Sequence, residues 1–199
     1  LINAHDHILG NYLPKVGKGP YINWLPWDND LKSADTYVER QQIDIETSYY
    51  LGAYRNLLSG VTTVSDHIPH FVNDPYIDKM PIRIIRDYTL AHSVTSFALK
   101  WGEGIQKEDQ LALEKDFPFV THCQEGFDEE TLRDTQVLEE NGALGEHAAL
   151  VHCIGLSDED IDTHARYGSN IIWCPDSNMY MYNRTLKVKS CLEKGINVA

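Results

Sequence analysis

Short apolar runs rich in β-branched residues alternate with amphipathic segments along most of the chain. The apolar runs predict strands, and the segments of helical period predict helices. The predicted strands lie at 1–4, 60–67, 81–90, 117–123, 147–154, 169–175 and 196–199, with a further candidate at 96–102. The predicted helices lie at 33–60, 107–116, 128–144, 156–168 and 184–195. Strands that alternate with helices pair in parallel through right-handed crossovers, so we predict an α/β fold.

The number of strands favours a closed barrel over an open sheet. Counting the candidate at 96–102, the pattern gives eight strands, as in a (β/α)8 TIM-like barrel. A doubly wound dinucleotide-binding sheet is disfavoured because no glycine-rich fingerprint follows any strand. The chain starts at Leu1 rather than Met and stops inside the apolar run 196–199. We therefore expect one barrel domain over 1–199, incomplete and truncated in or before the eighth strand.

Two of the predicted helices carry recognisable end signals. Ser33 or Asp35 could cap the helix at 33–60, and Gly60 would stop it. Ser157 is the expected cap of the helix at 156–168, which ends in a glycine. The stretch 21–30 between the first strand and the first helix contains Pro and aromatic residues and is expected to be a loop.

Composition limits the partners and the compartment. The 199 residues carry a net charge of −13, which disfavours nucleic acids and anionic membranes as partners. No apolar run approaches the length of a membrane span, and no signal-peptide pattern is seen. The four cysteines form no C-x-x-C pair, as expected of free thiols in a reducing compartment. We expect a cytoplasmic protein with a small-molecule substrate, and homo-oligomerisation remains open.

Two histidines end the first predicted strand. Alternate residues of a strand point to the same face, so His5 and His7 would share one face. Neutral imidazoles in this arrangement can converge on zinc or another transition metal. The alternative is one hydrogen-bonded core histidine and one histidine that faces solvent. Two ligands are too few for a metal site, so the choice depends on the rest of the chain.

Histidines recur where other predicted strands end. His122 and His152 lie near the ends of two later strands, and His67 ends the strand at 60–67. The carboxyl ends of barrel strands lie at one rim, where active sites form. This recurrence favours a metal centre over scattered structural histidines. Cys174 ends the strand at 169–175 and is followed by Pro175 and the sequence DSN.

Other polar and aromatic residues near this rim are candidates for catalysis or binding. Glu125, three residues after His122, could take a proton from a metal-bound water, or could simply begin the next helix. His67 and His92 could touch a substrate. Trp24 and Trp27 could form an apolar wall over a flat ligand, or could only pack their loop on the barrel.

The remaining histidines are expected to be outside the site. His147 opens a strand, at the end of the barrel that serves stability, and is expected to be structural. His164 lies in a helix rich in Asp and Arg and is expected to be solvated, and His70 is expected in a loop.

Five segments together resemble the amidohydrolase superfamily, in its branch of metal-dependent deaminases and chlorohydrolases that includes the triazine hydrolases. These segments are NAHDH, GVTTVSDH, THCQE, LVHC and WCPDSN, in the order of that family. The resemblance implies that His5, His7 and His122 bind one divalent metal ion, zinc or alternatively iron. It also implies that Glu125 is the proton shuttle and that His152 lies beside the reacting group. Ser177 and Asn178 would brace the rim, with a role in substrate binding.

The sequence departs from the family pattern in three places. The family's last ligand is an Asp at the end of the eighth strand, typically in a G-T-D run, and the sequence stops before it. The accessory β-sandwich of the family is not present in this sequence. Trp173 stands where close relatives often have His before the C-P pair. This last difference is expected to change the substrate pocket.

The resemblance implies hydrolytic deamination of an amino-substituted heterocycle by metal-activated water. A single metal ion is expected because no lysine that could bridge two ions ends a strand. One alternative keeps the fold and opens a cyclic amide, as imidazolonepropionase-like enzymes do. Another releases chloride or an amine in place of ammonia. A third is a non-catalytic barrel that only binds a ligand or a metal ion.

Overall fold

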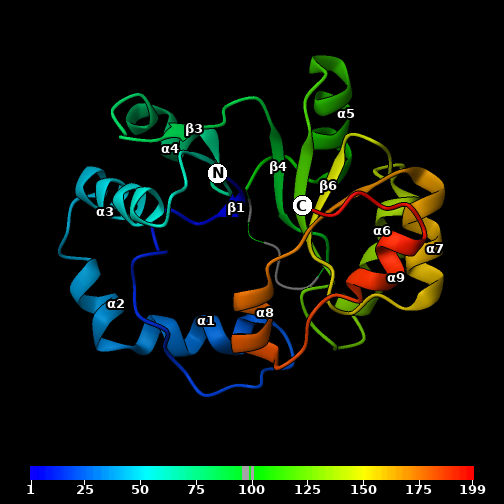
Figure 1. The fold of residues 1–199 in the computed structure, drawn as a ribbon, viewed down its shortest axis with the longest axis horizontal. Helices are drawn as coiled ribbons and strands as arrows, with labels where there is room; N and C mark the ends of the chain where they lie inside the picture. Colours follow the sequence, from blue (N-terminus) through cyan, green and yellow to red (C-terminus); the bar gives the residue numbers. More distant parts are fainter. Residues whose placement is uncertain (96–98, 100) are drawn as a thin grey trace. The chain divides into compact units, whose positions relative to one another are not determined.

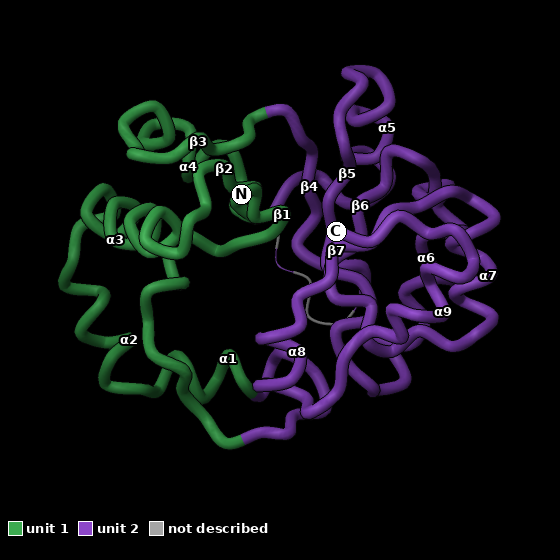
Figure 2. The backbone as a smooth tube through the Cα atoms, in the orientation of Figure 1, with its two compact units in different colours: residues 1–18, 27–86 green, residues 19–26, 87–199 purple. Residues whose placement is uncertain are grey.

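A computed structural model describes residues 1–95, 99 and 101–199 (Figure 1). Internal contacts group these residues into two compact units (Figure 2). Unit 1 comprises residues 1–18 and 27–86, and unit 2 comprises residues 19–26 and 87–199. Each unit has a parallel β-sheet and an apolar core of its own. The α/β class and the parallel pairing of the strands are therefore as predicted.

Unit 1 is built on three parallel strands in the order β1-β2-β3. These are β1 (Ile2–Asp6), β2 (Thr63–Asp66) and β3 (Arg83–Ile84). Its helices are α2 (Asp35–Arg40), α3 (Ile45–Leu58) and α4 (His70–Ile77), and α1 (Trp24–Ser33) has its first three residues in unit 2. Tyr49 and Ala53 of α3 pack with Val64 of β2 in the core.

The prediction of one long helix at 33–60 is wrong. The chain forms α2 and α3 there, separated by residues 41–44. The carboxylate of Asp44 accepts a hydrogen bond from the backbone N–H of Thr47, and this N-cap begins a second helix. Ser33 instead ends α1, which begins within the stretch 21–30 that was predicted to be a loop, and Asp35 is the first residue of α2. Gly60, with φ of 79°, follows α3 as expected of a C-terminal stop.

The single strand predicted at 81–90 is two strands. β3 ends at Ile84, and β4 (Thr89–Ser93) belongs to the sheet of unit 2. The polar pair Arg86–Asp87 lies in the segment that separates them. The candidate strand at 96–102 lies largely outside the described residues.

Unit 2 contains four parallel strands in the order β4-β5-β6-β7. The three that follow β4 are β5 (Phe119–Cys123), β6 (Ala148–His152) and β7 (Asn170–Ile172). Its helices are α5 (Ile105–Lys115), α6 (Asp134–Glu140), α7 (Asp158–Tyr167), α8 (Pro175–Tyr182) and α9 (Val188–Glu193). Figure 1 shows α6, α7 and α9 together on one side of this sheet. Val198 forms a parallel bridge with Ile171, so the predicted last strand begins beside β7.

Helix α7 begins and ends as the sequence predicts, but one of its side chains does not lie where expected. Ser157 and Asp160 form a capping box, and Gly168 ends the helix with φ of 75°. His164, expected to be solvated, is fully buried, and its Nε2 lies 3.0 Å from the hydroxyl oxygen of Thr135. It shares the buried face of α7 with Ile161, three residues earlier. Burial disfavours the imidazolium and lowers the pKa of His164 to about 4.

A His164→Gln variant is expected to be less sensitive to acid than the wild type. Between about pH 6.5 and pH 4 the unfolded chain binds a proton at His164 that the folded chain does not bind. Folding stability from this group is therefore lost as the pH falls through that range, by about 3 kcal/mol. Urea unfolding at pH 7 and pH 4.5 measures the difference. An equal loss of stability in both proteins would contradict the prediction.

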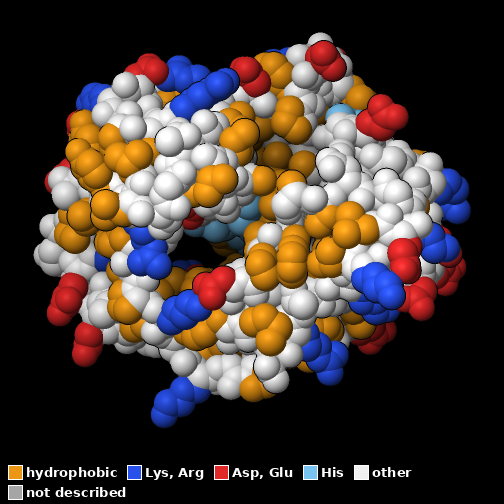
Figure 3. Space-filling view, viewed as in Figure 1, with side chains coloured by type: hydrophobic (Ala, Val, Ile, Leu, Met, Phe, Trp, Pro, Cys, Tyr) orange, Lys and Arg blue, Asp and Glu red, His pale blue; other side chains and the backbone are white. Residues whose placement is uncertain are grey.

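The surface of unit 1 has an apolar region on α3. Leu51, Tyr54 and Leu58 lie along one side of this helix and are exposed, and Figure 3 shows apolar side chains gathered there. None of the helices in the described part of the chain is both long and apolar enough to cross a membrane.

Candidate active site

Three histidines of unit 2 come from neighbouring strands. β4, β5 and β6 pair in parallel, with His122 opposite Val151 and Cys123 opposite His152. The ring centroids of His92 and His122 are 5.3 Å apart, and those of His122 and His152 are also 5.3 Å apart. The parallel register therefore brings together imidazoles that are thirty residues apart in the sequence, at the carboxyl edge of the sheet.

The backbone at this edge is held in an uncommon conformation. Gln124, His152 and Cys153 have φ angles of 45°, 72° and 51°, in the left-handed region that residues other than glycine seldom adopt. The backbone N–H of Gln124 donates to the Asp134 carboxylate at 2.6 Å, and its side-chain amide donates to the Thr135 hydroxyl at 3.0 Å. These bonds fix the turn that carries Glu125. Strain of this kind is concentrated at functional sites.

The imidazole of His122 is buried and has a defined tautomer. Its Nδ1 donates to the backbone carbonyl of His92 at 2.5 Å, and the residue is 4% exposed. With the proton on Nδ1, the neutral ring keeps its lone pair on Nε2. Histidines that bind metals usually donate their other N–H to a carbonyl or a carboxylate in this way.

Glu125 and His152 form a buried pair. Nε2 of His152 lies 3.4 Å from Oε1 of Glu125, and Nδ1 of His152 donates to Oδ1 of Asn178 at 2.7 Å. Both side chains are buried, and a carboxyl group beside an imidazole can take up or release a proton.

The surroundings of Glu125 act on its pKa in both directions. Burial raises the pKa of Glu125, whereas the charge on His152 and a hydrogen bond from Tyr182 act in the opposite direction. The hydroxyl of Tyr182 donates to Oε1 of Glu125 at 2.9 Å. A carboxyl group with a raised pKa can serve as an acid or a base near neutral pH.

A small pocket opens beside this pair. It is lined by Trp24, Ser93, His122, Glu125, Thr131 and Asp134. The ring centroid of His92 is 5.0 Å from that of Trp24 and 4.7 Å from that of Trp101. Both indoles meet the imidazole edge to face. Asn23 donates to Asp128 at 2.9 Å and so ties the segment that carries Trp24 to the loop after β5. Trp24, expected in a loop, is the first residue of α1 and lines this pocket.

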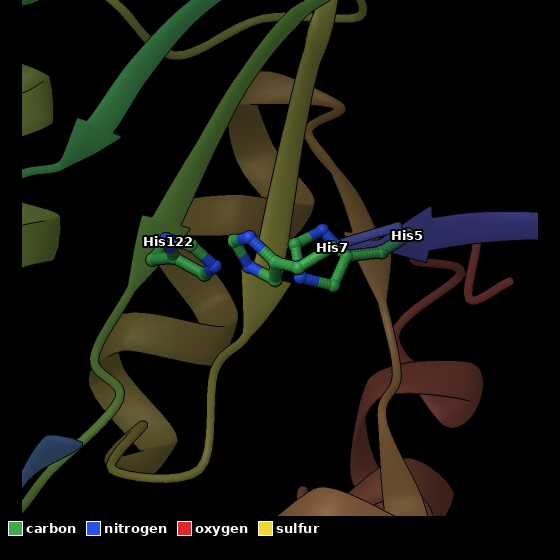
Figure 4. A group of neighbouring side chains, drawn as sticks. All are labelled: His5, His7 and His122. Atoms are coloured by element: carbon green, nitrogen blue, oxygen red, sulfur yellow. The ribbon is translucent and has the colours of Figure 1, made fainter. Parts of the chain in front are cut away.

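The histidine pair of unit 1 lies at the carboxyl end of β1. The ring centroids of His5 and His7 are 5.0 Å apart, and His67 lies 5.1 Å from the first ring and 5.5 Å from the second. Figure 4 shows that His5 and His7 come from the end of β1 and His122 from the end of β5. His67, which follows β2, therefore belongs to the same cluster as the H-x-H pair.

Two carboxylates of unit 1 are neighbours of these histidines in the sequence and are held by hydrogen bonds. Asp6, between them in sequence, accepts hydrogen bonds from the side-chain amides of Asn11 and Asn56 at 2.9 Å and 2.6 Å. Asp66 accepts from the backbone N–H of Ile8 at 3.0 Å and is 1% exposed. Burial, with a smaller contribution from the charge on Asp6, raises the pKa of Asp66 to about 7.

An Asp66→Asn variant is expected to lose part of the pH dependence of folding. The folded chain holds a proton at Asp66 that the unfolded chain releases above about pH 4. Stability from this group is therefore present at pH 4 and declines as the pH rises to about 7, by up to about 4 kcal/mol. Urea unfolding of the metal-free protein at pH 5 and pH 8 measures it, with Asp74→Asn as the exposed control. A parallel decline in both variants would show that Asp66 is not the source.

The other residues predicted from the sequence lie in varied places. Trp27 is on α1 and half-buried, in unit 1. Ser177 donates to the carbonyl of Cys174 at 3.2 Å in the first turn of α8, and Asn178 is fully buried against His152. Trp173 donates to the hydroxyl of Thr185 at 2.6 Å.

His147 pairs with Asp109 at 2.6 Å, as a structural histidine would, whereas His70, expected in a loop, begins α4.

Tyr182 and Trp101 are site residues that the sequence did not indicate. Tyr182 lies in α8, which the hydrophobic pattern did not predict, because polar residues follow the C-P pair there. Its spacing of four residues from Asn178 would have placed both on one helical face, had the helix been predicted. Trp101 lies in the stretch 96–102, which was treated only as a candidate strand.

The donor atoms of these clusters suit a divalent transition metal. Two imidazoles bound to one tetrahedral zinc ion have ring centroids about 5 Å apart, because each Zn–N bond is about 2.0 Å. His5 and His7 have this separation, 5.0 Å. In unit 2, one ligand atom from each of His122, Glu125 and His152 lies within 4.8 Å of the others. Imidazole nitrogens fixed by a carbonyl, as in His122, are typical of zinc sites.

The chain resembles curated deaminases in sequence. It is 32% identical over 98 residues to a 5-methylthioadenosine/S-adenosylhomocysteine deaminase from Syntrophobacter fumaroxidans, a match that covers 46% of this chain and 22% of that protein. It is 29% identical over 154 residues to a 5'-deoxyadenosine deaminase from Methanothrix thermoacetophila, covering 72% of this chain and 36% of that protein. The matches thus span well under half of either relative. No family model matches the chain.

Solved structures share its fold at low sequence identity. An atrazine chlorohydrolase from Arthrobacter aurescens, solved with zinc, has a TM-score of 0.77 at 15% identity, covering 100% of this chain and 58% of that one. A guanine deaminase from C. acetobutylicum, solved with guanine, has a TM-score of 0.70 at 16% identity, covering 99% and 59%. The comparisons confirm the resemblance that the motifs indicate, to the deaminase and chlorohydrolase branch of the amidohydrolase superfamily.

Proposed function

We propose that this chain is the catalytic part of a metal-dependent hydrolase that removes ammonia from an amino-substituted heterocycle. The observation that carries the proposal is the buried Glu125–His152 pair, which lies beside the imidazole of His122. Curated proteins named as deaminases of adenosine-like compounds have similar sequences, which supports deamination over the other hydrolytic reactions.

We propose that His5, His7 and His122 hold one divalent ion, zinc rather than iron. The spacing of His5 and His7 and the tautomer of His122 support this assignment. When bound, the ion supplies Lewis acidity, which makes water acidic enough to yield hydroxide near neutral pH. Zinc suits imidazole ligands in a site that keeps an open position for water or substrate.

Glu125 and His152 have complementary roles in this proposal. Glu125 takes a proton from the attacking water and delivers it to a ring nitrogen of the substrate, which makes the ring carbon more electrophilic. His152, oriented by Asn178, donates a hydrogen bond from Nε2 to the oxygen that becomes attached to that carbon. The adduct then loses ammonia, which carries away the remaining proton.

The walls of the site would bind the ring of the substrate. Trp24 lines the pocket in unit 2 and offers a planar face to a heterocycle, and His92 lies between Trp24 and His122. We assign His67 and Trp27 of unit 1 to the same function, with Ser177 bracing the start of α8. We further propose that the strands β1–β7 are successive strands of one (β/α)8 barrel, and that the protein acts on a small molecule in the cytoplasm.

The proposal is tested by the reaction that the zinc-loaded protein catalyses. We expect release of ammonia from one or more members of a panel of aminopurines, aminopyrimidines and amino-triazines. Ring opening of cyclic amides, or release of chloride from chloro-triazines without ammonia, would instead support the alternative reactions. Stoichiometric zinc without any turnover would show a binding protein and contradict the proposal.

A further inference from the structure

We propose that Tyr182 is a positioning residue that fixes the carboxyl group of Glu125 for proton transfer, an inference that rests on the proposed hydrolase function. The phenol hydroxyl of Tyr182 donates to Oε1 of Glu125 at 2.9 Å. Tyr182 is 2% exposed and Glu125 is 9% exposed, so water competes little for this bond. A hydrogen bond to a buried carboxylate is among the stronger ones in proteins.

A single helix face holds both members of the proton-transfer pair. Asn178 and Tyr182 lie four residues apart in α8, so their side chains project from the same face. Asn178 accepts from Nδ1 of His152 at 2.7 Å, while Nε2 of His152 lies 3.4 Å from the same Oε1 that Tyr182 contacts. The side chains of Asn178, His152, Glu125 and Tyr182 contact one another in that order, so this series of contacts begins and ends on α8. This helix therefore sets the distance between Glu125 and His152.

The hydroxyl of Tyr182 restricts how Glu125 can turn. The terminal torsion of a glutamate is broad, and the carboxyl group rotates unless its oxygens are held. The hydroxyl of Tyr182 and Nε2 of His152 both contact Oε1 of Glu125. We therefore assign to Oε2 the transfer of the proton from water to the substrate. The ring of Tyr182 packs against Phe127, whose ring centroid is 6.3 Å away, and the Arg184 guanidinium carbon lies 4.7 Å from the centroid of the Phe127 ring. These contacts hold the phenol in place.

A Tyr182→Phe variant tests the inference, with Tyr167→Phe as the matched control. Tyr167 also donates to a glutamate, Glu139, at 3.1 Å, but this pair is on the surface. In the zinc-loaded protein we expect Tyr182→Phe to lower kcat about tenfold and to change KM by less than about twofold. The control should leave both constants unchanged. In a Glu125→Ala background, Tyr182→Phe should have no further effect on kcat, because no carboxyl group remains to be positioned.

A second measurement does not depend on activity. Urea unfolding of the metal-free protein should show that Tyr182→Phe raises the unfolding equilibrium constant about tenfold when Glu125 is present, and much less in the Glu125→Ala background. An active protein in which the two substitutions have independent effects on kcat and on unfolding overturns the role of Tyr182 alone. A wild type that hydrolyses nothing overturns the proposed function, and the catalytic role of Tyr182 with it, even where unfolding shows the coupling.

Discussion

A Glu125→Gln variant is expected to keep its metal ion and to lose about a thousandfold in kcat. Glutamine has nearly the shape of glutamate, and its Oε1 can still accept the hydroxyl proton of Tyr182. It cannot take a proton from water or return one to the substrate. The loss should fall on kcat rather than KM, because the transfer occurs in the transition state.

Steady-state kinetics and metal analysis of the same preparations measure this effect. Glu129→Gln, an exposed substitution in the loop after β5, is the matched control and should behave as wild type. Unchanged kcat in the Glu125→Gln variant would show that another group moves the proton. Loss of the metal together with activity would instead place Glu125 among the ligands of the ion.

The second large effect is expected for His122→Ala. Removal of this imidazole should weaken zinc binding by more than about a hundredfold, since loss of even a partner behind a ligand costs about 10- to 100-fold. The ring of His122 is buried, and its tautomer is set by the His92 carbonyl, which leaves Nε2 unprotonated for the ion. At limiting zinc, the activity should fall by at least the same factor as the affinity for zinc.

Competition with a chelating dye measures the affinity of this variant. His70→Ala is the control, because His70 is half-exposed at the start of α4 and pairs with Asp74. The control should bind zinc as wild type does. Equal affinity of the His122→Ala variant and the wild type would remove His122 from the metal centre.

The unit 2 part of the candidate site could be predicted from sequence because its geometry follows from local rules. The apolar runs before His122 and His152 identify strands, and parallel pairing places the ends of neighbouring strands at one edge. The H-x-H pair is similarly local, since alternate strand positions share a face. The rings of His5 and His7 are 5.0 Å apart, although His7 lies one residue beyond the end of β1.

Features that depend on tertiary packing could not be predicted. His164 looked solvated because its neighbours in sequence are charged, yet it faces inward beside Ile161. The break at 41–44 depends on whether Asp44 caps a helix or continues one, and both are compatible with the hydrophobic pattern. Tyr182 contacts Glu125, a residue 57 positions earlier, through a helix that has little apolar periodicity. Contacts of this kind have no signature in a single sequence.

The central claim is that His5, His7 and His122 bind one ion together. The most direct measurement is anomalous diffraction at the zinc absorption edge from crystals of the zinc-loaded protein. The account predicts a single strong peak, with a nitrogen of each of these three side chains at about 2.0–2.1 Å from it. A peak bound by other residues, or no peak in crystals of a protein that contains stoichiometric zinc in solution, would contradict it.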